Sequence, residues 1–130
     1  MSLYNKYIKY KNKYLLLKGG AKTITINDRA FNEIKNGNKT IEGRVLKKFF
    51  EDLKVGETIT FKNSKSEEVK KKISNIIQYN NFSEMLEKED FKKVLPYDDI
   101  LKIEDGVSYY TRLYEGTDLE NCKVIAIHLI

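Results

Sequence analysis

The sequence predicts an α+β fold, in which about five to six short, mostly antiparallel strands form a small, partly closed β-barrel with short helices around it. Three observations support this fold class. Short runs rich in β-branched residues alternate between apolar and polar side chains, and segments with helical spacing of apolar residues lie between them. The two kinds of segment do not follow the regular order of βαβ units. With 130 residues, the chain has the length of one domain whose core needs no disulfide.

The strands are predicted from β-branched residues and alternation. They cover Thr23–Ile26, Lys39–Arg44, Thr58–Lys62, Val69–Tyr79 and Lys123–Ile130. A turn at Lys54–Glu57 precedes the third strand, and Asn63–Ser66 form a hairpin tip between the third and the fourth. The last strand is apolar on both faces, so we expect it in the interior of the sheet.

The helices are predicted from apolar spacing and from their end signals. Asn27 and Asp28 are good N-caps for the first helix, which ends at Gly37. Ser83 is expected to begin a later helix with a capping box, and Pro96 and Gly116 each end a helix. The remaining predicted helices are Val45–Leu53, Ser83–Glu89, Phe91–Leu95 and Asp105–Glu115.

Residues 1–20 are predicted to form a basic leader in front of a domain that spans residues 21–130. In the leader, apolar and tyrosine side chains recur with heptad-like spacing at Leu3, Tyr7, Tyr10, Tyr14 and Leu17. This spacing predicts an amphipathic helix over roughly residues 3–18, which Gly19-Gly20 would end. The leader resembles Tyr/Lys-rich leaders of giant DNA virus proteins. That resemblance implies a viral source, with the virus-infected host cytoplasm or the virion as location.

The composition excludes several classes of protein. The net charge is +5, but residues 1–18 hold five lysines and no acid, so the remainder carries 19 basic and 19 acidic residues. A global basic field on the domain is therefore excluded. With Cys122 as its one cysteine and His128 as its one histidine, the chain can form no intrachain disulfide and is not expected to hold a closed zinc site. We expect an intracellular, reducing location, no cofactor, no metal and no transmembrane segment.

The segment Gly37–Arg44 is the most informative part of the sequence. Strand alternation directs Ile41 towards the core, whereas Thr40, Glu42 and Arg44 share the opposite face. If a neighbouring helix covers that face, the two charged side chains are partly buried and should pair with each other or with an ionic ligand. The alternative is a solvated strand with an ordinary surface ion pair.

The same residues resemble the ASCH domain family. The shared order is Gly37, Lys39, Thr40, Glu42 and Arg44, followed by the turn Val55-Gly56-Glu57. Further similar segments are 79–86, 104–114 and 124–127, so the resemblance covers roughly residues 22–130. It implies a PUA-like fold, which is a small β-barrel with flanking helices.

Two functions are implied by this resemblance. Many members of the family are proposed RNA-binding modules, and small bacterial members remove the acyl group from N4-acetylcytidine-type nucleosides. In those amidohydrolases the catalytic lysine corresponds to Lys39, the threonine position is occupied by Glu42, and the glutamate is matched best by Glu104 or Asp105. Without the hydroxyl, Glu42 would have to act as a general base while Lys39 stabilises the oxyanion.

We therefore favour a binding module for RNA or a nucleotide-like ligand, with the amidohydrolase as the first alternative. The second alternative is a protein-interaction module directed by the leader helix. Aromatic side chains that could stack on bases extend the expected site. The expected ligand-binding residues are Lys39, Thr40, Glu42, Arg44, Tyr79, Glu104, Asp105 and Tyr110.

Overall fold

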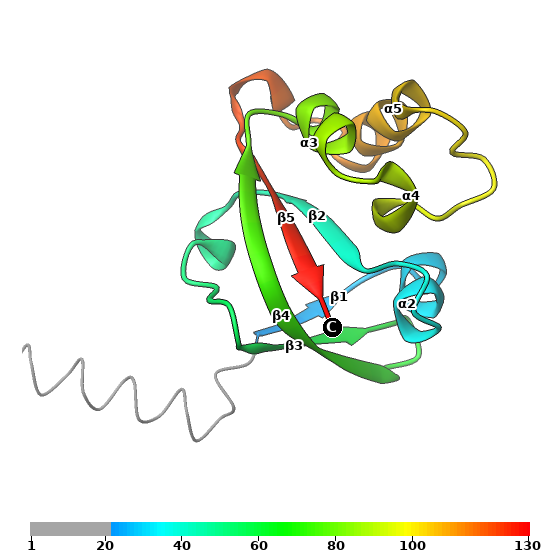
Figure 1. Cartoon of the computed structure of the whole chain (residues 1–130), viewed down its shortest axis with the longest axis vertical. Helices are drawn as coiled ribbons and strands as arrows, with labels where there is room; N and C mark the ends of the chain where they lie inside the picture. Colours follow the sequence, from blue (N-terminus) through cyan, green and yellow to red (C-terminus); the bar gives the residue numbers. More distant parts are fainter. Residues whose placement is uncertain (1–21) are drawn as a thin grey trace, which may run out of the picture.

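A computed structural model describes residues 22–130, and the leader with its predicted helix lies outside the described residues. Five strands form one sheet in the order β1-β3-β4-β5-β2 (Figure 1). Their bounds are β1 (Lys22–Thr25), β2 (Ile41–Val45), β3 (Thr58–Lys62), β4 (Glu68–Tyr79) and β5 (Val124–Leu129). The α+β class is confirmed, and all five predicted strands are present within two residues of their expected ends.

The sheet is a mixed half-barrel. β1 pairs with β3 in parallel, and the other neighbours are antiparallel. β4 bends the sheet because its first half pairs with β3 and its second half pairs with β5 across a bulge between Ile73 and Asn75. The end strands β1 and β2 are not paired with each other. β5 lies between β4 and β2, as its two apolar faces predicted.

Helices cover the sheet on both sides (Figure 1). The helix α2 lies beside β1, whereas α3, α4 and α5 gather on the other side of β2 and β5. The bounds are α2 (Asp28–Lys35), α3 (Phe82–Lys88), α4 (Phe91–Val94) and α5 (Ile103–Leu113), with single 3-10 turns η1 (Lys48–Phe50) and η2 (Leu119–Asn121). None of these helices is both long and apolar enough to cross a membrane.

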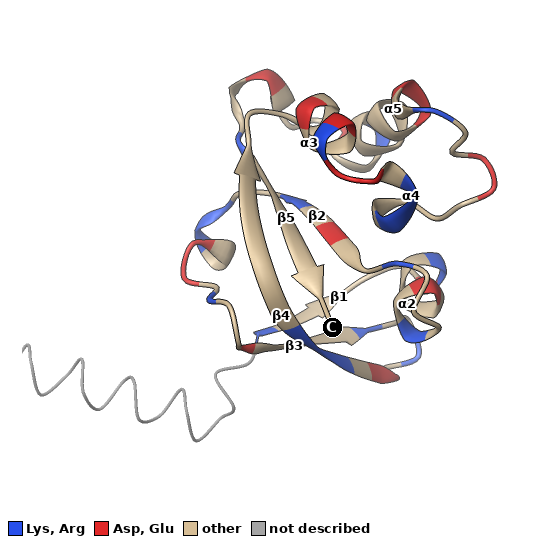
Figure 2. Ribbon diagram, in the orientation of Figure 1, with Lys and Arg blue, Asp and Glu red and all other residues tan. Residues whose placement is uncertain are grey.

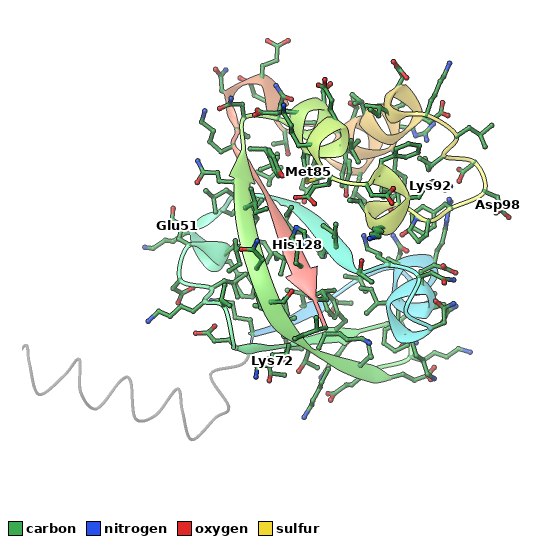
Figure 3. All side chains as sticks on the ribbon, in the orientation of Figure 1. Glu51, Lys72, Met85, Lys92, Asp98 and His128 are labelled. Atoms are coloured by element: carbon green, nitrogen blue, oxygen red, sulfur yellow. The ribbon has the colours of Figure 1, made fainter. Side chains whose placement is uncertain are left out.

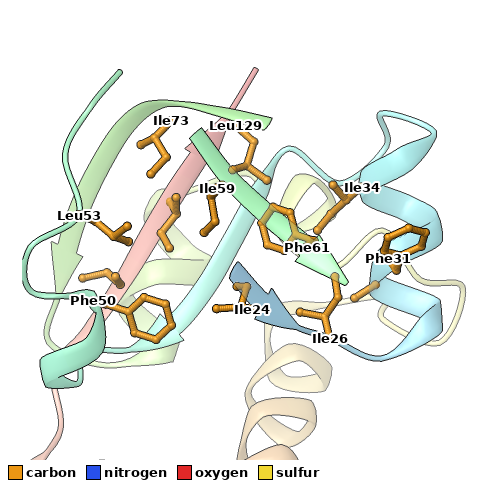
Figure 4. Close-up of a cluster of buried hydrophobic side chains, with 13 residues drawn as sticks. Ile24, Ile26, Phe31, Ile34, Phe50, Leu53, Ile59, Phe61, Ile73 and Leu129 are labelled. Atoms are coloured by element: carbon orange, nitrogen blue, oxygen red, sulfur yellow. The ribbon is translucent and has the colours of Figure 1, made fainter. Parts of the chain in front are cut away.

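Two hydrophobic clusters occupy the two faces of the sheet. The first lies inside the half-barrel, where Phe31 and Ile34 of α2 meet Ile59 and Phe61 of β3 (Figure 4). The second packs β2 and β5 against α3–α5 around Met85 and other apolar side chains. β5 contributes alternate residues to each cluster. The burial of both faces of β2 is what places the Gly37–Arg44 segment in a covered position.

Two predicted helix details are wrong. Val45–Leu53 holds only the 3-10 turn η1, because Val45 completes β2 and Phe50 and Leu53 reach the first cluster without a regular helix. Ser83 does not cap α3. The Asn81 side chain accepts a hydrogen bond from the Glu84 N–H at 2.8 Å, and the Glu84 carboxylate accepts one from the Asn80 N–H. The Asn81–Glu84 pair has the three-residue spacing that this arrangement requires.

Candidate functional site

A cavity of about 290 Å³ opens between the unpaired ends of the half-barrel. Its walls come from the end of β1, the start of α2, the strand β2, the loop after α4 and the helix α5. The lining residues are Thr25, Ile26, Asn27, Ala30, Lys39, Glu42, Gly43, Arg44, Leu95, Tyr97, Tyr109, Tyr110, Leu113 and Tyr114. The volume is close to the lower end of the range for small-molecule pockets, about 300–1,000 Å³.

Lys39 reaches the cavity from the turn that follows α2. Gly37 has φ of +86°, a left-handed conformation that lets the chain turn sharply after the helix. The Lys39 side chain is 2% exposed, and its ammonium donates to the carbonyl oxygens of Ile41, at 2.9 Å, and Val94. Burial lowers the pKa of Lys39 below its usual value, and the nearby carboxylate of Glu42 opposes this shift.

Glu42 joins Lys39 to Arg44 in a continuous ionic chain. Its Oε1 lies 3.5 Å from the Lys39 Nζ, and its Oε2 lies 3.5 Å from the Arg44 Nη2. Glu42 is almost fully buried, whereas a quarter of the Arg44 side chain is exposed. The expected pair between Glu42 and Arg44 is present, and the alternative of a solvated strand with a surface ion pair is wrong because Glu42 is only 6% exposed. With all three side chains charged, the chain carries a net charge of +1.

Four tyrosines form the aromatic wall of the cavity. Tyr110 stacks on Phe82 with ring centroids 3.9 Å apart, which fixes its ring inside the second cluster. Tyr109 lies edge-on to Tyr110, and the Tyr114 hydroxyl accepts a hydrogen bond from the Val45 N–H at 3.3 Å. Tyr109 and Tyr110 belong to α5 and Tyr114 is its C-cap residue, and all three contact both the second cluster and the cavity.

The fourth tyrosine, Tyr97, is held by contacts on both sides. The Arg29 guanidinium lies 3.7 Å from the centre of the Tyr97 ring, and Arg29 also pairs with Asp99. Lys92 Nζ donates to the carbonyl oxygens of Tyr97 and Ile100, at 2.8 and 2.9 Å, and this closes the loop after α4. Figure 3 shows Lys92 on α4 and Asp98 on that loop. Tyr97 is therefore positioned by three elements before any ligand arrives.

Two buried hydroxyls in this wall are without hydrogen-bond partners. Tyr97 and Tyr110 are 4% and 2% exposed, and neither phenolic oxygen bonds to another group in residues 22–130. The Tyr97 and Tyr109 rings are tilted towards each other, with centroids 5.8 Å apart. Burial, the main cause, raises the pKa of both phenols, and the carboxylate of Glu42 raises it further. Buried hydroxyls are costly when unpaired, so both retain an unused capacity for hydrogen bonding.

The structure brings only part of the predicted site together. Lys39, Glu42, Arg44 and Tyr110 line the same cavity. Thr40, by contrast, does not line it: its backbone N–H donates to the Lys93 carbonyl oxygen, and its carbonyl oxygen accepts from the Leu129 N–H.

Both acidic residues predicted from the start of α5 lie outside the cavity. The Asp105 carboxylate accepts from the N–H groups of Leu101 and Lys102, so it caps the helix, and Glu104 is exposed. Tyr97, Tyr109 and Tyr114, which the sequence also offers as aromatic side chains that could stack on bases, line the cavity too, whereas no sequence pattern singled out Gly43.

Tyr79 lies away from the cavity, in a second polar cluster. Its hydroxyl donates to the Glu89 Oε1 at 2.6 Å, and the same oxygen lies 3.1 Å from the Nε2 of His128. His128 sits on β5 and Met85 on α3 (Figure 3). The carboxylate therefore holds the strand β4 against β5 and the segment after α3.

The Tyr79 phenol is expected to ionise at a higher pH than an ordinary tyrosine. Burial, with the hydrogen bond to Glu89, raises its pKa to about 12 from 10.0. Because the folded state disfavours the phenolate, its contribution to stability is complete below pH 10 and is lost as the pH rises to about 12. The difference in phenolate absorbance between the wild type and Tyr79→Phe isolates this group. A difference curve with its midpoint near pH 10 would contradict the prediction.

Charged residues of both signs are spread over the described part of the chain. Basic and acidic residues are interspersed along most of the ribbon, and the run Lys70–Lys72 lies near the start of β4, which begins with the acidic Glu68 (Figure 2). In residues 22–130, no three His, Cys, Asp or Glu side chains are grouped closely enough to hold a metal ion.

Comparisons with known proteins agree with this fold. The family model of the ASCH domain matches residues 24–130. No curated protein matches the chain. Among solved structures, the crystal structure of hypothetical protein PH0355 is similar, with 32% identity and a TM-score of 0.74 over 84% of this chain and 96% of the other.

Two further solved structures extend the comparison. The NMR structure of a Pyrococcus furiosus protein has 29% identity and a TM-score of 0.65, over 84% of this chain and 94% of the other. The crystal structure of ASCH from Zymomonas mobilis has 16% identity and a TM-score of 0.55, over 84% of this chain and 66% of the other. At that identity, the last match supports the fold alone.

Proposed function

This chain belongs to the ASCH domain family, and we propose that it is a binding module for RNA or a nucleotide-like ligand, held in the cavity around Glu42 and Arg44. The observation that carries the proposal is the composition of this one cavity. A guanidinium and four tyrosines line a space of about 290 Å³, and two of these tyrosines, Tyr97 and Tyr110, carry buried hydroxyls without partners in residues 22–130. Aromatic walls with an arginine suit a base and its phosphate or sugar.

The size of the cavity limits what enters it. The space is small for a ligand pocket, so it would admit one nucleoside unit of an RNA and leave the neighbouring nucleotides outside. Single-stranded RNA can splay out one base in this way. The described surface is mixed in charge, so the affinity of the domain would depend on this insertion more than on general attraction to phosphates.

The geometry supports Arg44 more than Lys39 as the cation that meets the ligand. The Lys39 ammonium already faces two carbonyl oxygens and the Glu42 carboxylate. Arg44 is partly exposed, and a guanidinium has five N–H donors, of which the pair with Glu42 uses only some. Lys39 would then hold Glu42 in place, and Glu42 would orient Arg44.

The same contacts favour binding over hydrolysis. A general base needs an oxygen that can take a proton from water, and both oxygens of Glu42 are paired with cations. An oxyanion needs donors aimed at it, and those of Lys39 are directed at protein acceptors. The amidohydrolase therefore has weaker support than the binding module.

We expect Arg44→Met to weaken the binding of labelled single-stranded RNA to the full-length chain by about tenfold, because it removes a charge-assisted hydrogen bond. Arg112→Met is the matched control. It removes the same charge from the exposed side of α5, outside the cavity, and should leave binding almost unchanged. Fluorescence anisotropy at low salt measures both, and circular dichroism verifies that they are folded. Equal losses in the two variants would overturn the proposal, because general charge or the leader would then explain binding.

A further inference from the structure

The free edge of β2 presents backbone groups to the cavity at Gly43. The Leu129 N–H donates to the carbonyl oxygen of its partner Thr40, and the Leu46 N–H donates to that of Lys123. In an antiparallel pair, hydrogen-bonded residues alternate with residues whose N–H and C=O point away from the partner strand. Residues 40, 42, 44 and 46 thus bond to β5, whereas residues 41, 43 and 45 point outward.

The neighbours of Gly43 confirm this alternation. The outward carbonyl oxygen of Ile41 accepts from Lys39, and the outward N–H of Val45 donates to the Tyr114 hydroxyl. Both are therefore occupied. Between them, the N–H and C=O of Gly43 bond to no other group within residues 22–130, although Gly43 is buried and lines the cavity. A buried peptide of this kind needs both an acceptor and a donor.

Tyr110 lies directly against this peptide. A Cβ atom on Gly43 would come within 2.6 Å of the Tyr110 Oη and 2.7 Å of the Met85 Cε. The absence of a side chain is what lets the unpartnered Tyr110 hydroxyl pack against the face of β2 at Gly43. A backbone donor, a backbone acceptor and a hydroxyl that can act as either thus belong to two neighbouring residues that line the same cavity.

We propose that Gly43 and the Tyr110 hydroxyl bind the hydrogen-bonding edge of a single nucleobase. This inference rests on the proposed function and names the part of the ligand that enters. A planar ring with an acceptor beside a donor satisfies both groups of Gly43 at once, as two neighbouring strands satisfy each other. A phosphate group offers acceptors alone, so it would leave the Gly43 carbonyl unpaired against another oxygen. Arg44 remains for the sugar or phosphate.

Titration of the full-length chain with uridine, cytidine, adenosine and guanosine tests the proposal, with binding followed by protein NMR. At least one nucleoside should bind. If uridine binds, N3-methyluridine should bind at least about tenfold more weakly, because methylation removes the donor and leaves the Gly43 carbonyl unpaired. If another nucleoside binds, its analogue methylated on the ring nitrogen of the hydrogen-bonding edge should likewise bind at least about tenfold more weakly.

Tyr110→Phe should weaken the same binding by about tenfold, because it removes one hydrogen-bonding group from the site. Tyr79→Phe makes the same chemical change outside the cavity and should not affect binding. If neither methylation of the base nor the Tyr110→Phe substitution changes the affinity for the nucleoside, the inference is overturned. So does the failure of all four nucleosides to bind while RNA binding still depends on Arg44. That second outcome leaves the proposed function intact, whereas RNA binding without dependence on Arg44 removes both.

Discussion

Replacing Lys39 with methionine is expected to lower the free energy of unfolding by about 3–5 kcal/mol, the usual cost of removing one partner of a buried ion pair. The variant keeps most of the volume of the side chain. It leaves the Glu42 carboxylate without its buried cation and deprives the carbonyl oxygens of Ile41 and Val94 of their donor. Urea denaturation at neutral pH, compared with the wild type, measures the loss.

A second substitution separates the charge from the packing. Glu42→Gln removes the carboxylate that Lys39→Met deprives of its buried cation, so the double variant should lose clearly less stability than the sum of the two single losses. Lys35→Met is a control for lysine removal, since Lys35 is exposed at the end of α2. If Lys39→Met costs no more than Lys35→Met, Lys39 does not hold the site together.

The fold was largely predictable because local patterns determined its elements. β3 has the predicted bounds, and α2 has the predicted cap at Asn27, because short-range signals were strong there. The pairing of β1 with β3 in parallel was not predictable from alternation, which is the same for parallel and antiparallel neighbours. The 3-10 turn η1 was predicted as a longer helix because apolar spacing alone does not distinguish the two over one turn.

The candidate site was predictable only for residues that lie near one another in the sequence. Alternation along one strand correctly grouped Glu42 with Arg44 and predicted their contact. Tyr79 was expected in the same cleft, but β4 carries it to a cluster with Glu89 on the other face. Tyr97 reaches the cavity through a loop held by Lys92, a contact that no local pattern encodes.

Gly43→Ala is the second substitution for which we expect a large effect, a loss of about 1–3 kcal/mol in the free energy of unfolding. The new methyl group would lie 2.6 Å from the Tyr110 Oη and 2.7 Å from the Met85 Cε, so both neighbours must move. Tyr110 has little room, because its ring is stacked on Phe82. Alanine restricts the unfolded chain more than glycine does, and this offsets only part of the cost.

Tyr110→Phe provides the test of that explanation. On its own it removes a hydroxyl that has no partner, so stability should change by less than about 0.5 kcal/mol or rise slightly. Combined with Gly43→Ala, it removes the closer of the two obstructing atoms, and the double variant should be more stable than Gly43→Ala alone. Thermal and urea denaturation of the wild type, the two single variants and the double variant give the coupling free energy between the two positions.

A double variant no more stable than Gly43→Ala would show that the hydroxyl is not what requires glycine at this position. A partial recovery would assign the remaining cost to Met85, whose flexible side chain can shift. The single variant Tyr110→Phe and the double variant with Gly43→Ala both lack the hydroxyl but should remain folded. A loss of ligand affinity in these proteins would therefore be due to the missing hydroxyl and not to unfolding.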